Sequence, residues 1–140
     1  FVAVRPVCII SISNHGMKPA QILKYSVWPC RQFPVLNKET GRPPYADLQD
    51  FNFPLSRDVR HQIRHDFAVW PTLLDWDKFP VTDSGLIGFK LFGAIWYDNG
   101  FGVEKITGFG VEYDPERSIR KGPFYPVFNP TTTTGYNYMT

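Results

Sequence analysis

The fold is indicated most clearly by one stretch of the sequence, LIGFKLFGAIWYDNGFGVEKITGFGVEY, residues 86–113. It holds two alternating runs, whose shared faces carry Ile87, Phe89, Leu91, Ile95 and Tyr97 before the turn and Phe101, Val103, Lys105, Thr107, Phe109, Val111 and Tyr113 after it. A repeat of two residues is the period of a β-strand, and Asn-Gly between two such runs is the strongest short hairpin signal. We therefore predict an antiparallel hairpin that turns at residues 98–100.

Several glycines interrupt these two runs, namely Gly88, Gly93, Gly102, Gly108 and Gly110. A glycine inside a strand weakens it unless a bulge, a bend or a close neighbour uses the space. The chain has 12 Phe, 7 Tyr and 4 Trp to accommodate. We therefore predict that the glycines leave room for aromatic rings.

Two further strands are predicted at VCIISIS, residues 7–13, and AQILKYSVW, residues 20–28. In the second of them the alternation places Gln21, Leu23, Tyr25 and Val27 on the buried face. Asn14 and Gly16 suit the turn between the strands, because both tolerate left-handed backbone angles. His15 has no carboxylate or thiol at ligand spacing beside it, so we interpret it as a solvated turn residue.

The two cysteines, Cys8 and Cys30, are predicted to be free thiols. If residues 7–13 and 20–28 form a hairpin, Cys8 lies opposite residue 26, four residues away from Cys30. At about 3.3 Å per residue, that offset exceeds the ~7 Å limit between the Cα atoms of a disulfide. Free thiols agree with a reducing compartment.

The remaining segments give weaker signals. Residues 29–58 are rich in proline and are predicted to form a long loop, with one helical turn within PPYADLQDF, residues 43–51. Residues 59–70 fit either a strand or a helix, and residues 71–80 fit one or two helical turns. The tail, residues 122–140, is predicted to lie extended over the sheet.

Length and composition fit one mainly β domain covering residues 1–140. The chain is 43% hydrophobic and 20% charged, and its 13 Pro and 11 Gly break up long helical patterns. We predict an antiparallel β-sandwich, immunoglobulin-like, with about seven strands and one or two short helical turns in its long loops. A net charge of +2 without a clustered basic face argues against nucleic acid as a partner.

Few residues suggest chemistry. A metal-dependent hydrolase using His61 and His65, with Asp66, Asp75 or Asp77 as a carboxylate ligand, is one alternative, but no Glu stands beside the first histidine. Cys8 lies among apolar residues, where burial makes a thiol inert. We therefore assign no catalytic residue and no cofactor.

The tryptophans are a second candidate site. Trp28, Trp70, Trp76 and Trp96 could stack on a sugar, as in a carbohydrate-binding module, or on a peptide strand added to a sheet edge. The simpler interpretation is that these rings fill the core.

Two motifs resemble those of a known family. They are N-x-G-x-x-P-A, made by Asn14, Gly16, Pro19 and Ala20, and LFGAIWYDNGFG, residues 91–102. The chain resembles a broad family of uncharacterised bacterial proteins with one or two N-terminal membrane helices and a β-sandwich head. Those proteins often carry Cys and His around the second strand of the late hairpin, whereas VEKITGFGVEY, residues 103–113, has neither.

We therefore expect a non-catalytic head domain that binds a protein or a small ligand. The resemblance implies a membrane tether preceding Phe1, and free thiols favour a head on the cytoplasmic side. The ligand, the partner and the oligomeric state stay open at this point.

Overall fold

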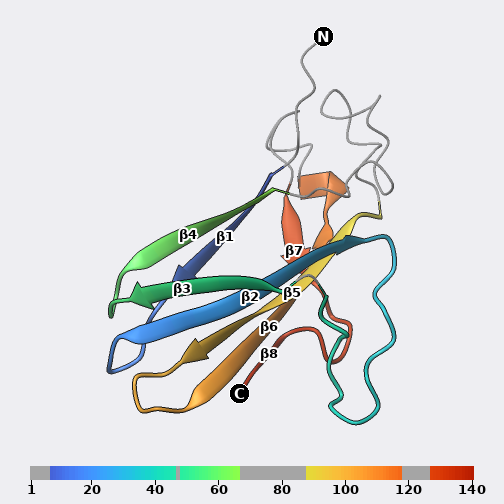
Figure 1. Ribbon diagram of the computed structural model, residues 1–140. Coiled ribbons are helices and arrows are strands. Elements are labelled where there is room, and N and C mark those ends of the chain that lie inside the picture. The colour runs from blue at the N-terminus through green and yellow to red at the C-terminus, as the bar shows by residue number, and fades with distance from the viewer. Residues whose placement is uncertain (1–6, 47, 67–87, 118–126) are drawn as a thin grey trace.

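The computed structural model describes residues 7–46, 48–66, 88–117 and 127–140 (Figure 1). It is mainly β, with one short helical turn at residues 115–117 in the part described. Its strands are β1 (Val7–Ser13), β2 (Ala20–Cys30), β3 (Gln49–Leu55), β4 (Arg60–Asp66), β5 (Lys90–Asp98), β6 (Glu104–Tyr113), β7 (Phe128–Pro130) and β8 (Tyr138–Met139). The mainly β prediction is confirmed, with eight strands in place of about seven.

The strands form two antiparallel sheets. The larger one, here called the main sheet, has the order β3-β2-β5-β6-β7, and β8 also pairs with β6. The smaller one consists of β1 and β4 and is here called the ribbon. The ribbon lies over one face of the main sheet, which makes the fold sandwich-like (Figure 1). The immunoglobulin-like character stays a prediction.

The hairpin predicted from residues 86–113 is confirmed. β5 and β6 pair from Lys90 opposite Glu112 to Asp98 opposite Glu104. Gly100 adopts a φ of 85°, and its N–H donates to the Asp98 carboxylate at 2.8 Å. The predicted faces are confirmed within the strands, because Phe89, Leu91, Ile95 and Tyr97 enter the same core as Phe109, Val111 and Tyr113. Phe101 and Val103, which alternation places on one face with the latter three, are exposed in the turn, and Ile87 lies outside the described residues.

The prediction that residues 7–13 and 20–28 pair with each other is wrong. β1 pairs with β4, while β2 pairs with β3 and β5 in the other sheet. The loop between them therefore crosses from the ribbon to the main sheet. Both cysteines are nevertheless free, as predicted, with Cys8 on the ribbon and Cys30 on the main sheet.

The long loop predicted over residues 29–58 is also corrected. Its second half contains β3, and the predicted helical turn in residues 43–51 is wrong because Gln49–Leu55 pairs with β2. The ambiguity at residues 59–70 is settled over Arg60–Asp66, which form a strand. The helical turns expected at residues 71–80 lie outside the described residues.

A bulge in β2 explains why its predicted buried face is only half correct. The register on both neighbouring strands shifts between Ile22 and Lys24. The extra residue, Leu23, moves Ile22 onto the same face as Tyr25 and Val27, and all three lie in the core facing the ribbon. A bulge places two residues opposite one, so simple alternation fails at that point.

The main sheet carries apolar clusters on both faces. The inner cluster lies between the sheet and the ribbon and includes Ile63 from β4. The outer cluster is built from Cys30, Phe92 and Tyr136, with Trp28, Phe33, Leu36 and Tyr45 packed against it. Residues 31–46 and 131–138 supply its cover. Two short parts of the predicted tail instead pair with β6 as β7 and β8, and residues 122–126 of that tail lie outside the described residues.

The predicted role of the glycines is confirmed at Gly108, where a Cβ atom would meet the Tyr138 ring, and in part at Gly93, where it would lie 2.7 Å from the Phe109 ring but would also meet the Ser26 carbonyl oxygen. At Gly110 the nearest atoms belong to no ring, because a Cβ atom there would lie 2.9 Å from both Cγ2 of Thr131 and Cβ of Tyr136. Gly88 and Gly102 do not serve this purpose. They have φ angles of 77° and 76°, which favour glycine for its backbone freedom.

Candidate functional site

The two histidines of the metal hypothesis are held apart by strand geometry. His61 stacks on Phe53 with ring centroids 4.0 Å apart, and Nδ1 of His65 lies 3.0 Å from the Tyr25 hydroxyl. Four residues along a strand span roughly 13 Å, which is too far for two ligands of one ion. The helical alternative that would have brought the rings together is wrong, because Arg60–Asp66 is a strand.

No group of three His, Cys, Asp or Glu in the described part of the chain is arranged to hold a metal ion. Asp66 ends β4, but its side chain is outside what the structure describes, as are Asp75 and Asp77. His15 is exposed in its turn, as predicted.

The cysteines lie in environments that suppress their reactivity. Burial raises the pKa of both thiols, Cys8 and Cys30, to about 11, and nearby Lys90 only partly offsets the effect at Cys30. Both thiols are therefore protonated at neutral pH, and they are poorly reactive because the thiolate is the nucleophile.

Of the four tryptophans proposed as a stacking platform, two can be placed. Trp96 is only 9% exposed, since Tyr45 packs edge-on against it at 5.3 Å and Nζ of Lys24 lies 5.2 Å from its ring centre. Trp28 is half-buried against the outer cluster. The expectation of exposed rings is therefore wrong at Trp96, while Trp70 and Trp76 lie outside the described residues.

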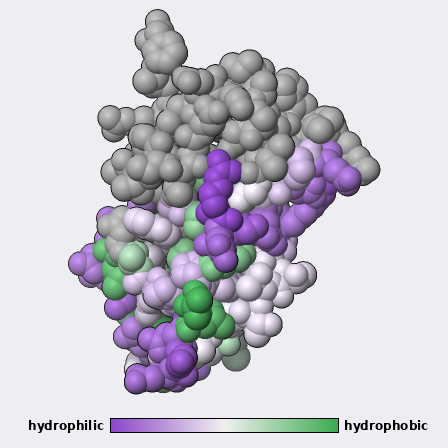
Figure 2. All heavy atoms as spheres, turned by 90° about the vertical axis from the view of Figure 1, so that its right-hand side faces the viewer, coloured by the Kyte–Doolittle hydropathy of each residue, from purple (hydrophilic) through white to green (hydrophobic). Residues whose placement is uncertain are grey.

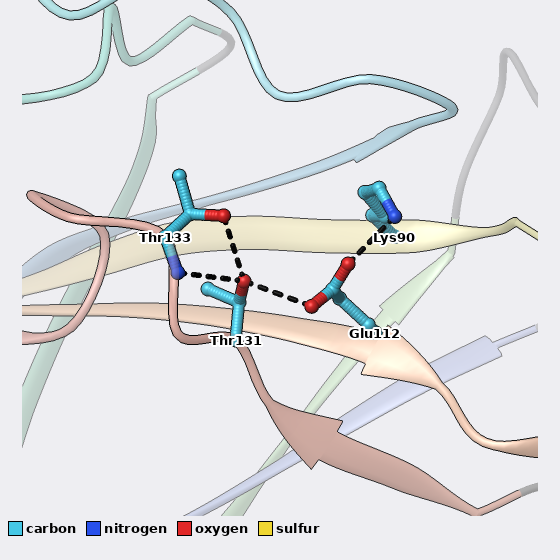
Figure 3. Close-up of polar contacts among 4 residues, drawn as sticks. All are labelled: Lys90, Glu112, Thr131 and Thr133. Atoms are coloured by element: carbon cyan, nitrogen blue, oxygen red, sulfur yellow. Dashed lines mark hydrogen bonds and ion pairs between the residues drawn. The ribbon is translucent and has the colours of Figure 1, made fainter.

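A polar network holds the tail against the main sheet (Figure 3). Nζ of Lys90 donates to Glu112 at 2.7 Å, and the Thr131 hydroxyl donates to the other Glu112 oxygen at 3.0 Å. The Thr133 N–H in turn donates to the Thr131 hydroxyl. The Lys90 hydrogen bond lowers the pKa of Glu112. Hydrogen bonds link the four residues in sequence from Lys90 through Glu112 and Thr131 to Thr133, so we interpret this network as structural.

Three turns meet at one end of the sandwich, and we call this end the loop tip. It comprises residues 14–19, 56–59 and 99–103, which lie side by side at the lower left of Figure 1. Asn14 joins the first two turns, because its side-chain amide donates to the Lys18 and Leu55 carbonyls and its own carbonyl accepts from the Asp58 N–H at 2.8 Å. The third turn touches the first, since a Cβ on Gly100 would lie 2.6 Å from the Pro19 carbonyl oxygen.

The loop tip exposes apolar side chains from each of its turns. Met17 is 84% exposed, Phe101 60%, Val59 48% and Val103 47%. Nζ of Lys18 lies 4.3 Å from the centre of the Phe101 ring. On the side of the molecule seen in Figure 2, by contrast, hydrophobic residues form only small separate areas among hydrophilic ones.

The outward face of the ribbon adjoins the loop tip and is polar and basic. Its exposed residues are Ile9, Ser11 and Ser13 from β1, which lie opposite Arg64, Gln62 and Arg60 from β4. Arg57 in the neighbouring turn lies 3.4 Å from Asp58. This face was not predicted, because the sequence alone did not show that β1 pairs with β4.

The loop tip was also missed from the sequence. Alternation places Phe101 on a strand face, the turn signals place Met17 between two strands, and neither pattern indicates that the two turns come together. A signal was present in the turns themselves, because exposed turns usually carry Gly, Pro, Asn, Asp or Ser rather than large apolar residues.

No helix among the described residues has the length and hydropathy needed to cross a membrane. The resemblance to tethered bacterial proteins therefore stays a prediction. No family model, curated protein or solved structure matches the chain.

Proposed function

We propose that this chain is a non-catalytic binding head that engages its partner through the loop tip, and that it belongs to a membrane-tethered bacterial protein. The observation that carries the proposal is the exposure of Met17, Val59, Phe101 and Val103 in three adjoining turns. Single exposed apolar residues are ordinary on a protein surface, but a group of them on one end is typical of an interaction site.

The loop tip rests on a rigid support. The Asn14 side chain fixes the first turn to the end of β3, and the third turn closes the central hairpin of the main sheet. Binding residues on loops held by a firm scaffold lose little conformational entropy when a partner arrives. This geometry supports recognition by a preformed surface.

The residues first considered for catalysis support the same proposal. His61 stacks on Phe53, His65 packs edge-on against Tyr25, and the two thiols have raised pKa values. Their contacts are those of packing residues, and an active site needs groups that face a substrate.

Photo-crosslinking tests the proposal. A benzophenone amino acid is placed at Phe101 or, as a control, at Val35, which is exposed in the loop that covers the outer cluster. We expect a covalent adduct, to protein or to lipid, from position 101 in cells that produce the full-length protein, and little from position 35. Equal adducts at both positions, or none at position 101, would overturn the proposal.

A further inference from the structure

We propose that the loop tip and the outward face of the ribbon together form a docking surface for an anionic lipid bilayer. This inference rests on the proposed function and names the partner of the same surface. Three observations carry it: the charge of the ribbon, the chemistry of its outward face, and the form of the apolar tip.

The net positive charge of the chain arises on the ribbon and its turns. Residues 7–19 and 56–66 contain four Lys or Arg and two Asp, a net charge of +2 that equals the net charge of the whole chain. The other residues therefore balance to zero. Of the two acids, Asp58 lies beside Arg57, and Asp66 lies opposite Val7, at the end of the ribbon farthest from the loop tip. This distribution favours an anionic partner on the ribbon side.

The outward face of the ribbon offers donors that suit lipid phosphates. Arg60 and Arg64 point to the exposed side of β4, and strand geometry separates them by roughly 13 Å. Gln62 lies between them, and Ser11 and Ser13 lie opposite on β1. Guanidinium groups and hydroxyls are the usual donors to phosphate oxygens.

The loop tip supplies the apolar half of the surface. Met17 is 84% exposed and Phe101 60%, and they come from two adjoining turns of the loop tip. Exposed apolar side chains can enter the soft boundary between headgroups and acyl chains without a matching pocket. The Lys18 ammonium above the Phe101 ring would then lie at headgroup level.

Two acids that flank the third turn, Asp98 and Glu104, limit the strength of binding. Asp98 is engaged with the Gly100 N–H, and Glu104 lies opposite it on β6. Membrane attachment needs two signals when each is weak. We therefore expect reversible, salt-sensitive docking that would reinforce a separate tether, and anionic lipids are most abundant on the cytoplasmic leaflet.

Vesicle co-sedimentation tests the inference. The purified chain is mixed with phosphatidylcholine vesicles that either contain about one third phosphatidylserine or contain none. We expect binding to the anionic vesicles only, weakened on raising the salt from about 0.1 M to 0.5 M. The double variants M17S/F101S and R60Q/R64Q should each lower the partition coefficient by about tenfold.

Matched controls separate a docking surface from a general loss. V35S removes another exposed apolar side chain, and K38Q removes another exposed cation, both from the loop over the outer cluster. Both controls should stay within about twofold of the unchanged chain. Circular dichroism verifies that each variant is folded. An equal loss in the controls, or equal binding to both kinds of vesicle, would contradict the inference.

The two experiments fail in different ways. If the chain ignores anionic vesicles while position 101 crosslinks to a protein, the lipid inference is wrong and the binding head stands. If the chain does not bind anionic vesicles and position 101 forms no crosslink, both proposals are wrong.

Discussion

The two faces of the main sheet are covered by different kinds of chain. The inner face packs against a second sheet, so both sides of that core consist of strands. The outer face packs against residues 31–46 and the tail, which are mostly irregular. Strand alternation specifies the first kind of core, because each strand presents every second residue to its partner sheet. The second kind of core depends on particular side-chain contacts.

Those contacts are hydrogen bonds and close packing of side chains against glycines. The Tyr136 hydroxyl donates to the Pro34 carbonyl, which joins the tail to the loop, and the Tyr45 and Tyr138 hydroxyls lie 2.8 Å apart. The Tyr138 ring occupies the space left by Gly108, and the Thr131 methyl group and the Tyr136 Cβ occupy the space left by Gly110. A cover of this type should be lost locally before the sandwich unfolds, because it lacks the cooperative ladder of a sheet.

Two phenylalanines on opposite faces give the largest expected effects. Phe89 and Phe92 are each 1% exposed, the first in the inner cluster and the second in the outer cluster. Phe89→Ala and Phe92→Ala should each lower the free energy of unfolding by about 4 kcal/mol, measured by urea denaturation.

The two variants should differ in which part of the chain loses protection from hydrogen exchange. Amide hydrogen exchange should show that Phe92→Ala releases the tail at residues 131–140, while Phe89→Ala lowers protection in the ribbon. If both variants lose protection evenly over the whole chain, the two covers are one cooperative unit and the contrast between the faces is wrong.

Gly110→Ala is expected to act on the outer cover alone. Its new Cβ would lie 2.9 Å from both Cγ2 of Thr131 and Cβ of Tyr136. We expect a loss of about 2 kcal/mol in the free energy of unfolding, because the tail must move away from β6. Adding Thr131→Ser removes one of the two clashing groups and should restore part of the loss. No recovery in the double variant would show that the Thr131 contact is unimportant.

The connection between the two sheets is tested at Asn14. Asn14→Ala removes the amide that bonds to the Lys18 and Leu55 carbonyls and the oxygen that accepts from the Gly16 N–H. We expect a loss of about 1.5 kcal/mol in thermal or urea unfolding. His15→Ala in the same turn is the matched control and should change stability by less than about 0.5 kcal/mol. Equal losses of stability in the two variants would mean that the Asn14 side chain does not stabilise the connection between the two sheets.

The contrast between the faces also explains how much the sequence predicts. The hairpin of β5 and β6 follows from local alternation and one Asn-Gly turn, and the space for a ring at Gly108 follows from composition. The partner of β1 cannot be predicted from local sequence. The choice between β2 and β4 depends on contacts between residues some fifty positions apart. The bulge at Leu23 is equally invisible to a repeat of two. The loop tip was missed for the same reason, since its three turns meet only through tertiary structure.

The smallest expected effect concerns the ion pair of the outer cover and its dependence on pH. Lys90 donates a hydrogen bond to Glu112 and thereby lowers the pKa of that carboxyl in the folded state. A lowered folded pKa means that the contribution is fully present above the unfolded pKa and is lost as the pH falls through the folded pKa. Because both side chains are partly exposed, we expect Glu112→Gln to lower the free energy of unfolding by only about 0.5 kcal/mol at neutral pH.

The difference between Glu112→Gln and the unchanged chain should therefore shrink below about pH 4, where the carboxyl becomes protonated. Urea unfolding at a series of pH values measures it, with Glu39→Gln in the exposed turn of the outer loop as a control that should show no such trend. A difference that stays constant down to pH 2 would show that Glu112 holds Thr131 by hydrogen bonding alone. The outer cover would then depend on shape and neutral hydrogen bonds, and its contrast with the inner core would be one of packing only.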